Sequence, residues 1–140
     1  MATCLFCLSP CGDEGAQFCS CKALAHQDCL TKYIVGEGKR GCPVCRVALP
    51  PDCMLEAFDH AYEESRHACG EAHPETQLHR LNRASVIAMA GRQHEALHEL
   101  ELLADENLEA TQRIVCRIEI ASCLSEIGRV LKLLRVWKPW

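Results

Sequence analysis

Apolar residues recur every three or four positions through most of residues 52–137, which is the spacing of one face of an α-helix. This pattern predicts four helices, over residues 75–90, 93–105, 109–127 and 129–137. Gly91 separates the first from the second, and Gly128 separates the third from the fourth. The C-terminal part of the chain is therefore expected to be all-α, built from helical hairpins.

The first three predicted helices each have apolar positions that we expect to pack in the core of this part of the chain. The expected core positions are Leu78, Leu81, Ala84 and Ala88 in the first helix, Ala96, Leu97, Leu100, Leu103 and Ala104 in the second, and Ile114, Ile118, Ala121 and Leu124 in the third.

A boundary precedes these helices at Pro50-Pro51-Asp52, where two prolines stop the preceding structure and the aspartate can cap a new helix. Leu55, Phe58 and Tyr62 then share one helical face. Residues 67–74 predict a break, and Pro74 suits the first turn of the next helix. We expect a separate domain over 1–50, a linker helix and loop over 51–74, and the helical region over 75–140.

Residues 1–50 follow a different pattern, in which cysteine and histidine come in close pairs. Of the 12 cysteines, 8 fall in the first 45 residues. Zn²⁺ prefers thiolate and imidazole, and a closed structural site uses four such ligands. Two closed zinc sites are therefore predicted from the four pairs Cys4 and Cys7, Cys19 and Cys21, His26 and Cys29, and Cys42 and Cys45.

Zinc would supply much of the folding free energy of this segment, because about fifty residues bury too little apolar surface to fold unaided. One short helix is expected at 30–35, followed by a loop at 36–41. A disulfide framework is the alternative use of so many cysteines. The N-terminus carries no signal-peptide pattern, so a reducing compartment, cytoplasmic or nuclear, is expected.

Charge and hydropathy argue against two classes of partner. Residues 1–51 carry 5 basic and 4 acidic residues, and residues 52–140 carry 10 basic and 15 acidic residues. Neither part forms the basic patch that nucleic-acid binding requires. Residues 114–134, the most apolar stretch, are interrupted by charged side chains, so no membrane span is expected.

The order of the eight ligands over residues 4–46 resembles a RING domain, in the RING-CH-like variant whose fifth ligand is histidine. Spacing alone leaves open whether the two sites are interleaved or sequential. The resemblance implies a cross-brace, in which the first and third pairs share one ion and the second and fourth pairs share the other. It assigns Cys4, Cys7, His26 and Cys29 to one zinc, and Cys19, Cys21, Cys42 and Cys45 to the second.

RING domains act mainly as ubiquitin ligases without a catalytic nucleophile, so the resemblance implies a ubiquitin-conjugating enzyme and ubiquitin as partners. Family members contact that enzyme through an apolar residue before the second ligand, an aromatic after the sixth, a proline inside the last pair and a basic residue after the final ligand. In this sequence those positions are Phe6, Tyr33, Pro43 and Arg46.

Two other classes of function remain open. Four residues separate Cys21 from His26, a gap that is also usual in PHD fingers, which read histone tails. PHD fingers typically place an aromatic residue two positions before the seventh ligand, where this chain has Arg40. Asp13, Glu14 and Asp28 are the acidic residues that such a reader could use. A zinc-stabilised interaction scaffold without transfer activity is the third class.

The helical part resembles tetratricopeptide repeats, which are stacked helical hairpins of about 34 residues. Gly91 and Gly128 lie 37 residues apart, and Ala84 and Ala121 each lie seven residues before one of these glycines. The resemblance covers residues 75–137 and implies a groove that holds a protein substrate or a peptide. The second repeat stops near Trp137 and Trp140, which suggests either a short or truncated member of the family or dimerisation through an unfinished end.

Several further residues invite other chemistry. Cys11 could replace a ligand of the first zinc. A catalytic thiol could come from Cys53, Cys69, Cys116 or Cys123, although Cys116 and Cys123 fall in a helix where buried packing is the expected role. A third metal group could come from His60, His67, Cys69 and His73, for which solvated side chains are the simpler interpretation.

Overall fold

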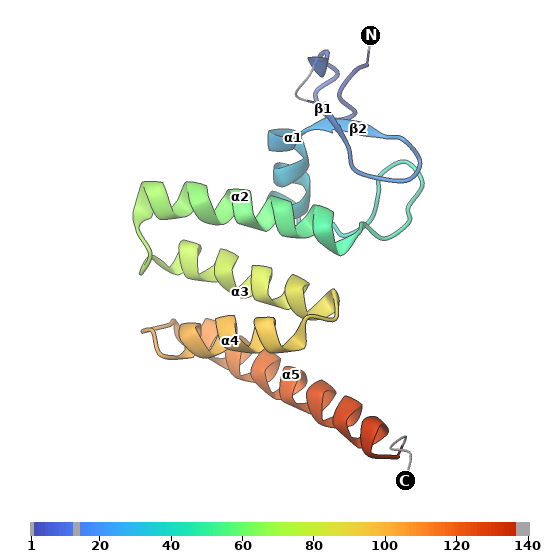
Figure 1. The fold of residues 1–140 in the computed structure, drawn as a ribbon. Helices are drawn as coiled ribbons and strands as arrows, with labels where there is room; N and C mark the ends of the chain where they lie inside the picture. The colour runs from blue at the N-terminus through green and yellow to red at the C-terminus, as the bar shows by residue number, and fades with distance from the viewer. Residues whose placement is uncertain (1, 13–14, 137–140) are drawn as a thin grey trace. The chain divides into compact units, whose positions relative to one another are not determined.

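The computed structural model describes residues 2–12 and 15–136, which form two compact units, Met1–Glu64 and Ser65–Trp140 (Figure 1). The first unit contains strands β1 (Gly15–Gln17) and β2 (Leu24–His26), the short helix α1 (Gln27–Thr31) and a π-helical turn η2 (Lys32–Gly36). Helices α3 (Pro74–Met89), α4 (Gln93–Ala104) and α5 (Ala110–Val136) build the second unit. The division falls within helix α2 (Pro51–Cys69).

The first unit has little regular structure and a small core. β1 and β2 pair antiparallel with Ala16 opposite Ala25, and η2 continues α1 directly. The predicted helix at 30–35 therefore begins earlier, at Gln27, and ends as a π-turn. The buried apolar side chains here are Phe18, Ala25, Leu30, Ile34, Leu49, Met54, Ala57, Phe58 and Ala61.

Helix α2 begins at Pro51, where the proline sequence predicted a new helix. Phe58 is buried as expected, whereas Leu55 and Tyr62 are half-buried. The predicted break at 67–74 is wrong at its first residues, because the helix continues to Cys69. Gly70 then stops it with a φ of +90°, a conformation that favours glycine.

The second unit packs α3 against α4 and α4 against α5, with the three helices side by side in Figure 1. The two helices predicted at 75–90 and 93–105 are confirmed as α3 and α4. Gly91, at φ +85°, makes the tight turn between them. Most of the predicted core is confirmed: Leu81, Ala84, Ala96, Leu100 and Leu103 are buried, whereas Leu78 and Ala104 are exposed.

The prediction for the last part of the chain is wrong. Gly128 does not interrupt the helix, because α5 runs without a break from Ala110 to Val136. A single glycine costs an α-helix about 1 kcal/mol, which the turns on both sides outweigh. One helix therefore replaces those predicted at 109–127 and 129–137, and Gly91 and Gly128 are not equivalent turns.

The predicted core face of α5 is also wrong. Ile114, Ile118 and Leu124 are 60%, 58% and 53% exposed, and Ala121 is exposed although its counterpart Ala84 is buried. Among residues 110–131, where burial is described, the buried positions are Gln112, Cys116 and Cys123. Apolar residues occur around most of this helix, so contact with α4 decides which face is covered. Trp137 and Trp140 lie outside the described residues.

None of the helices in the described ranges combines the length and the apolar character needed to span a bilayer.

Candidate metal centres

The first candidate centre joins the turn at residues 4–8 to the end of β2 and to α1. One ligand atom each from Cys4, Cys7, His26 and Cys29 lies within 4.8 Å of the others. The His26 Nδ1 atom is 3.3 Å from the Cys7 Sγ and 3.9 Å from the Cys29 Sγ. In a tetrahedral zinc site, Zn–S and Zn–N bonds of about 2.3 and 2.0 Å place neighbouring ligand atoms roughly 3.5–3.8 Å apart. These side chains therefore fit a zinc ion.

A hydrogen bond fixes which nitrogen of His26 faces this centre. The His26 Nε2–H donates to the Pro10 carbonyl oxygen at 3.1 Å. The ring proton therefore stays on Nε2, and Nδ1 presents its lone pair to the three thiols. A backbone carbonyl behind a histidine is the usual means by which proteins orient a metal-binding imidazole.

The second candidate centre consists of four cysteines. One Sγ atom each from Cys19, Cys21, Cys42 and Cys45 lies within 4.8 Å of the others. The Cys19 and Cys45 sulfurs are 3.4 Å apart, and the Cys21 and Cys42 sulfurs are 3.6 Å apart. Four thiolates at this spacing also fit a structural zinc ion.

The two centres are interleaved along the chain. The first pair, Cys4 and Cys7, meets the third pair, His26 and Cys29, while the second pair meets the fourth. This arrangement is the cross-brace that the sequence spacing left undecided between interleaved and sequential sites. Each centre closes a loop of chain that carries one ligand pair of the other centre. The two clusters therefore connect residues 4–45 into one module.

Similar backbone turns present the cysteine pairs. The N–H of Leu8 donates to the Cys4 carbonyl at 3.0 Å, and the N–H of Arg46 donates to the Cys42 carbonyl at 2.9 Å. Leu8 and Arg46 have φ values of 61° and 62°, and Lys22, directly after Cys21, has 68°. Isolated β-bridges, Thr3 to Pro10 and Gly41 to Ala48, flank the two longer turns.

Left-handed backbone after the second cysteine of a pair is a feature that sequence reasoning missed. Leu8, Lys22 and Arg46 are ordinary residues that give no local sign of a positive φ. The sequence feature that could have indicated a left-handed backbone is their common position, one residue after the second cysteine of a pair. The left-handed turn lets backbone N–H groups reach the sulfurs: the N–H of Ser9 bonds Cys7, and the N–H of Val47 bonds Cys45.

The charge balance within the clusters favours a bound cation. Burial raises the pKa of Cys4, but backbone N–H groups outweigh it and bring that pKa to about 6. The backbone N–H of Cys21 and the Cys45 thiol lower the pKa of Cys19 to about 7. Burial and the neighbouring thiols raise the pKa of Cys29 to about 11. Adjacent thiolates repel one another, and a dication at the centre would remove that repulsion.

Of the four expected partner contacts, the structure brings Phe6 and Tyr33 together. Their ring centroids lie 4.9 Å apart, and both residues are half-buried. The Tyr33 hydroxyl donates to the Gly41 carbonyl, next to the Cys42 turn, and burial raises the Tyr33 pKa. Pro43 and Arg46 are exposed on that turn. Two further apolar residues that the sequence pattern did not indicate, Val44 and Val47, are each 57% exposed on the same turn.

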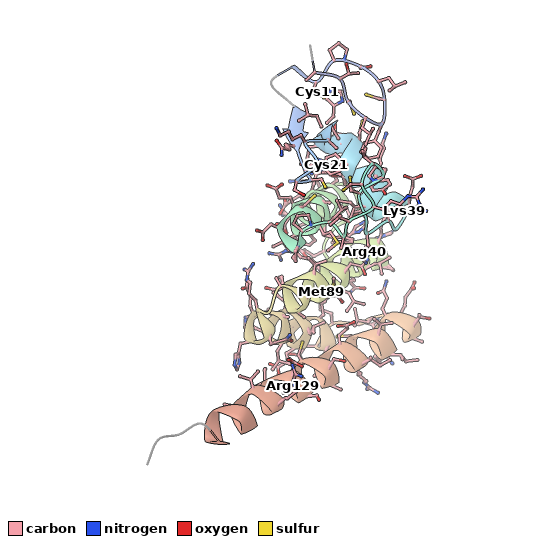
Figure 2. All side chains as sticks on the ribbon, turned by 90° about the vertical axis from the view of Figure 1, so that its right-hand side faces the viewer. Cys11, Cys21, Lys39, Arg40, Met89 and Arg129 are labelled. Carbon is pink, nitrogen blue, oxygen red and sulfur yellow. The ribbon has the colours of Figure 1, made fainter. Side chains whose placement is uncertain are left out.

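Cys11 is buried in the N-terminal loop, where Figure 2 labels it, but it does not belong to either group of four converging atoms. Burial, and then the charges of Cys4 and Cys7, raise the pKa of its thiol. A Cβ placed on Gly15 would lie 2.2 Å from the Cys11 Cβ. Cys11 therefore packs tightly against Gly15 and is not one of the four converging residues of the first centre.

Cys53, Cys116 and Cys123 lack the environment of a nucleophile. Burial raises the pKa of Cys53 to about 11, and burial also raises the pKa of Cys116 and Cys123. A reactive thiol needs the opposite shift. The Cys116 thiol donates to the Leu100 carbonyl at 3.4 Å, which is a packing role within the second unit.

No known protein-family model, curated protein or solved structure matches this chain. Its function is therefore inferred from the residues themselves.

Proposed function

We propose that the chain is a RING-type ubiquitin ligase. Its first unit binds two zinc ions and recruits a ubiquitin-conjugating enzyme, and its second unit holds the protein substrate or partner. The observation that carries this proposal is the interleaving of the two four-ligand groups, which places Phe6 against Tyr33 beside the turn that carries Pro43 and Arg46.

The proposed activity needs no catalytic nucleophile. A conjugating enzyme that carries ubiquitin on its own thiol reacts faster when ubiquitin is held in one orientation, and orientation alone can lower a barrier by several kcal/mol. Phe6, Tyr33 and Pro43 supply an apolar contact for the conjugating enzyme. Arg46, exposed and held by the left-handed turn, can donate to both partners through its planar fork of five N–H groups.

The test is ubiquitin discharge from charged conjugating enzymes by the zinc-loaded full chain. We expect discharge with at least one enzyme of a broad panel, and a loss of about tenfold or more for Arg46→Ala, which removes charged hydrogen bonds worth roughly 1.5–3 kcal/mol. Arg129→Ala is the matched control, because Arg129 is an exposed arginine on α5 whose side chain is 70% accessible (Figure 2). An inactive wild type, or an unchanged Arg46→Ala rate, would contradict the proposal.

A groove in the second unit supports the proposed partner-holding role. It has a volume of about 310 Å³ and lies between α3 and α5, with Met89, Cys123 and Glu126 among its lining residues. Met89 is 63% exposed there and offers a flexible apolar contact. A peptide with an apolar residue and a nearby positive charge would match the methionine and the glutamates of this groove.

One observation favours a second function, a reader of basic peptides such as histone tails. A groove of about 430 Å³ in the first unit is lined by the apolar Phe18, Leu30 and Leu55, and α2 contributes acidic residues to it, namely Asp52, Glu56 and Asp59. Titration with histone-tail peptides separates the two functions. A reader would bind them and lose affinity in Glu56→Lys but not in the exposed control Glu101→Lys, whereas a ligase would discharge ubiquitin without them.

A further inference from the structure

Three side chains of metal-ligating types meet within the second unit, at the connection between α2 and α3. One donor atom each from Cys69, His73 and Glu75 lies within 4.8 Å of the others. Cys69 is the last residue of α2, His73 is the N-cap of α3, and Glu75 lies in the first turn of α3. We propose that these side chains form a third metal site, for one divalent transition-metal ion of the zinc type.

The backbone of this connection holds the three residues near one another. The N–H of Gly70 donates to the Arg66 carbonyl at 3.0 Å, and the positive φ of Gly70 ends α2 directly after Cys69. The N–H of His73 donates to the Gly70 carbonyl at 3.4 Å, so the chain turns back within four residues. The turn is thus closed by hydrogen bonds that do not involve the three donor side chains.

The donor set selects the metal. Thiolate and imidazole are the ligands that Zn²⁺ and Co²⁺ prefer, whereas Ca²⁺ and Mg²⁺ require oxygen ligands throughout. Three protein ligands leave one tetrahedral position, and all three side chains are exposed, so water completes the coordination. This open site binds its ion more weakly than the two closed centres do.

The structure changes the group that the sequence suggested. His60 belongs to the first unit, where its ring lies 3.4 Å from Asp28 and 3.9 Å from Glu64. Of the four residues in the predicted group, Cys69 and His73 come together, and Glu75 joins them. Glu75 lies two residues after His73, a spacing to which sequence reasoning gave no weight.

Metal binding must compete with a helix cap. The His73 Nδ1 atom accepts a hydrogen bond from the Glu75 N–H at 3.1 Å, so the neutral ring carries its proton on Nε2. A metal at Nδ1 displaces this bond, and a metal at Nε2 moves the proton to Nδ1 and breaks the same bond. Occupation of the site therefore changes the hydrogen bonding of the His73 ring, which nitrogen NMR detects separately from the thiol.

The test uses the full chain with both cysteine-rich centres loaded with zinc, titrated with Co²⁺. We expect one equivalent of Co²⁺ to bind with thiolate-to-cobalt absorption, while the zinc content stays at two ions per chain. Cys69→Ser should abolish this absorption. His73→Asn should weaken Co²⁺ binding at least tenfold. Because asparagine is itself a good N-cap, α3 should still begin at the same residue.

Cys53→Ser and His98→Asn are the matched controls, because neither residue belongs to a metal-binding group among the described residues. Both should bind Co²⁺ as the wild type does. The proposal is overturned if the wild type takes up no additional equivalent, or if Cys69→Ser and His73→Asn bind it unchanged. Helix content by circular dichroism shows whether Cys69→Ser has kept its fold. If Cys69→Ser has lost it, the Co²⁺ binding of His73→Asn alone decides. Ubiquitin discharge is independent of all these outcomes.

Discussion

At the scale of single residues, the effect of a substitution at a few positions depends on neighbouring atoms that the residue type alone does not reveal. Gly15 is one, because its missing side chain leaves room for Cys11. His79 is another, because it is only 8% exposed and therefore cannot hold a proton as easily as a histidine in water. Substitutions at both positions are therefore expected to have effects that the same substitutions at exposed positions would not have.

Gly15→Ala should weaken the first metal centre. Its new Cβ would lie 2.2 Å from the Cys11 Cβ, and forcing an extra methyl group into a packed site costs about 1–3 kcal/mol. Faster zinc release to a chelator measures the effect. Gly36→Ala is the control, since a Cβ there meets nothing within 4 Å. Adding Cys11→Gly to Gly15→Ala removes the clash and should restore slow release; continued fast release would show that the crowding has another source.

His79 should make the second unit less stable in mild acid. Burial lowers its pKa, and Glu75, 3.9 Å from its Nε2, opposes this only in part. The unfolded chain, with the ordinary pKa near 6.5, therefore binds the proton more readily than the folded chain does. The contribution of His79 is complete above that pKa and is lost as the pH falls below it toward the folded value.

The measurement is the urea midpoint of helix unfolding at pH 7 and pH 5. The wild type should lose more stability between these two pH values than His79→Gln does. His98→Gln, at an exposed position on α4, should behave like the wild type. Equal losses in all three proteins would mean that His79 is not responsible for the pH dependence.

At the scale of elements, the two glycines of the helical part have opposite roles. Gly91 adopts φ +85° in the turn between α3 and α4, whereas Gly128 lies inside α5 with helical backbone. A Cβ on either meets nothing within 4 Å, so backbone conformation alone separates them. The sequence predicted equivalent interruptions because both glycines precede an arginine and lie 37 residues apart.

Replacing each glycine by alanine should therefore change stability with opposite sign. Gly128→Ala should stabilise the second unit by about 0.5–1 kcal/mol, because alanine is the better helix former. Gly91→Ala should destabilise it by roughly 1–2 kcal/mol, the cost of left-handed backbone for an L-residue. Urea unfolding followed by the helical signal measures both. If Gly128→Ala were as destabilising as Gly91→Ala, a turn at 128, and with it a second hairpin, would replace the continuous α5.

At the scale of the whole molecule, two units gain stability from different sources. The second unit buries apolar side chains between long helices, such as Ile87, Leu100 and Leu103. In the first, residues 4–45 form only short elements, and zinc at the eight converging ligand atoms would hold them together. About ten kcal/mol per ion is the contribution typical of structural zinc in small modules.

Removal of zinc should therefore unfold the first unit and leave the second folded. A strong chelator should unfold the first unit while the helical circular dichroism signal, dominated by α3 to α5, stays largely intact. Amide hydrogen exchange localises the change, with protection lost around β1 and β2 and kept in α3 and α4. Loss of most of the helical signal would show instead that the two units share a core.

The sequence by itself determined which residues could hold metal and where most helices lie, because both depend on short-range spacing. Two cysteines separated by two residues fit one turn whatever surrounds them, and α3 and α4 have apolar residues at helical intervals. Tertiary structure decided which ligand pairs meet, because the pairs that share a centre lie about twenty residues apart and their meeting depends on the path of the chain. It also decided the buried face of α5, since a helix that is apolar on several sides is oriented by the neighbour it packs against. The proposed site at Cys69, His73 and Glu75 depends on local structure instead, because its donors lie within seven residues of sequence and the turn at Gly70 brings them together.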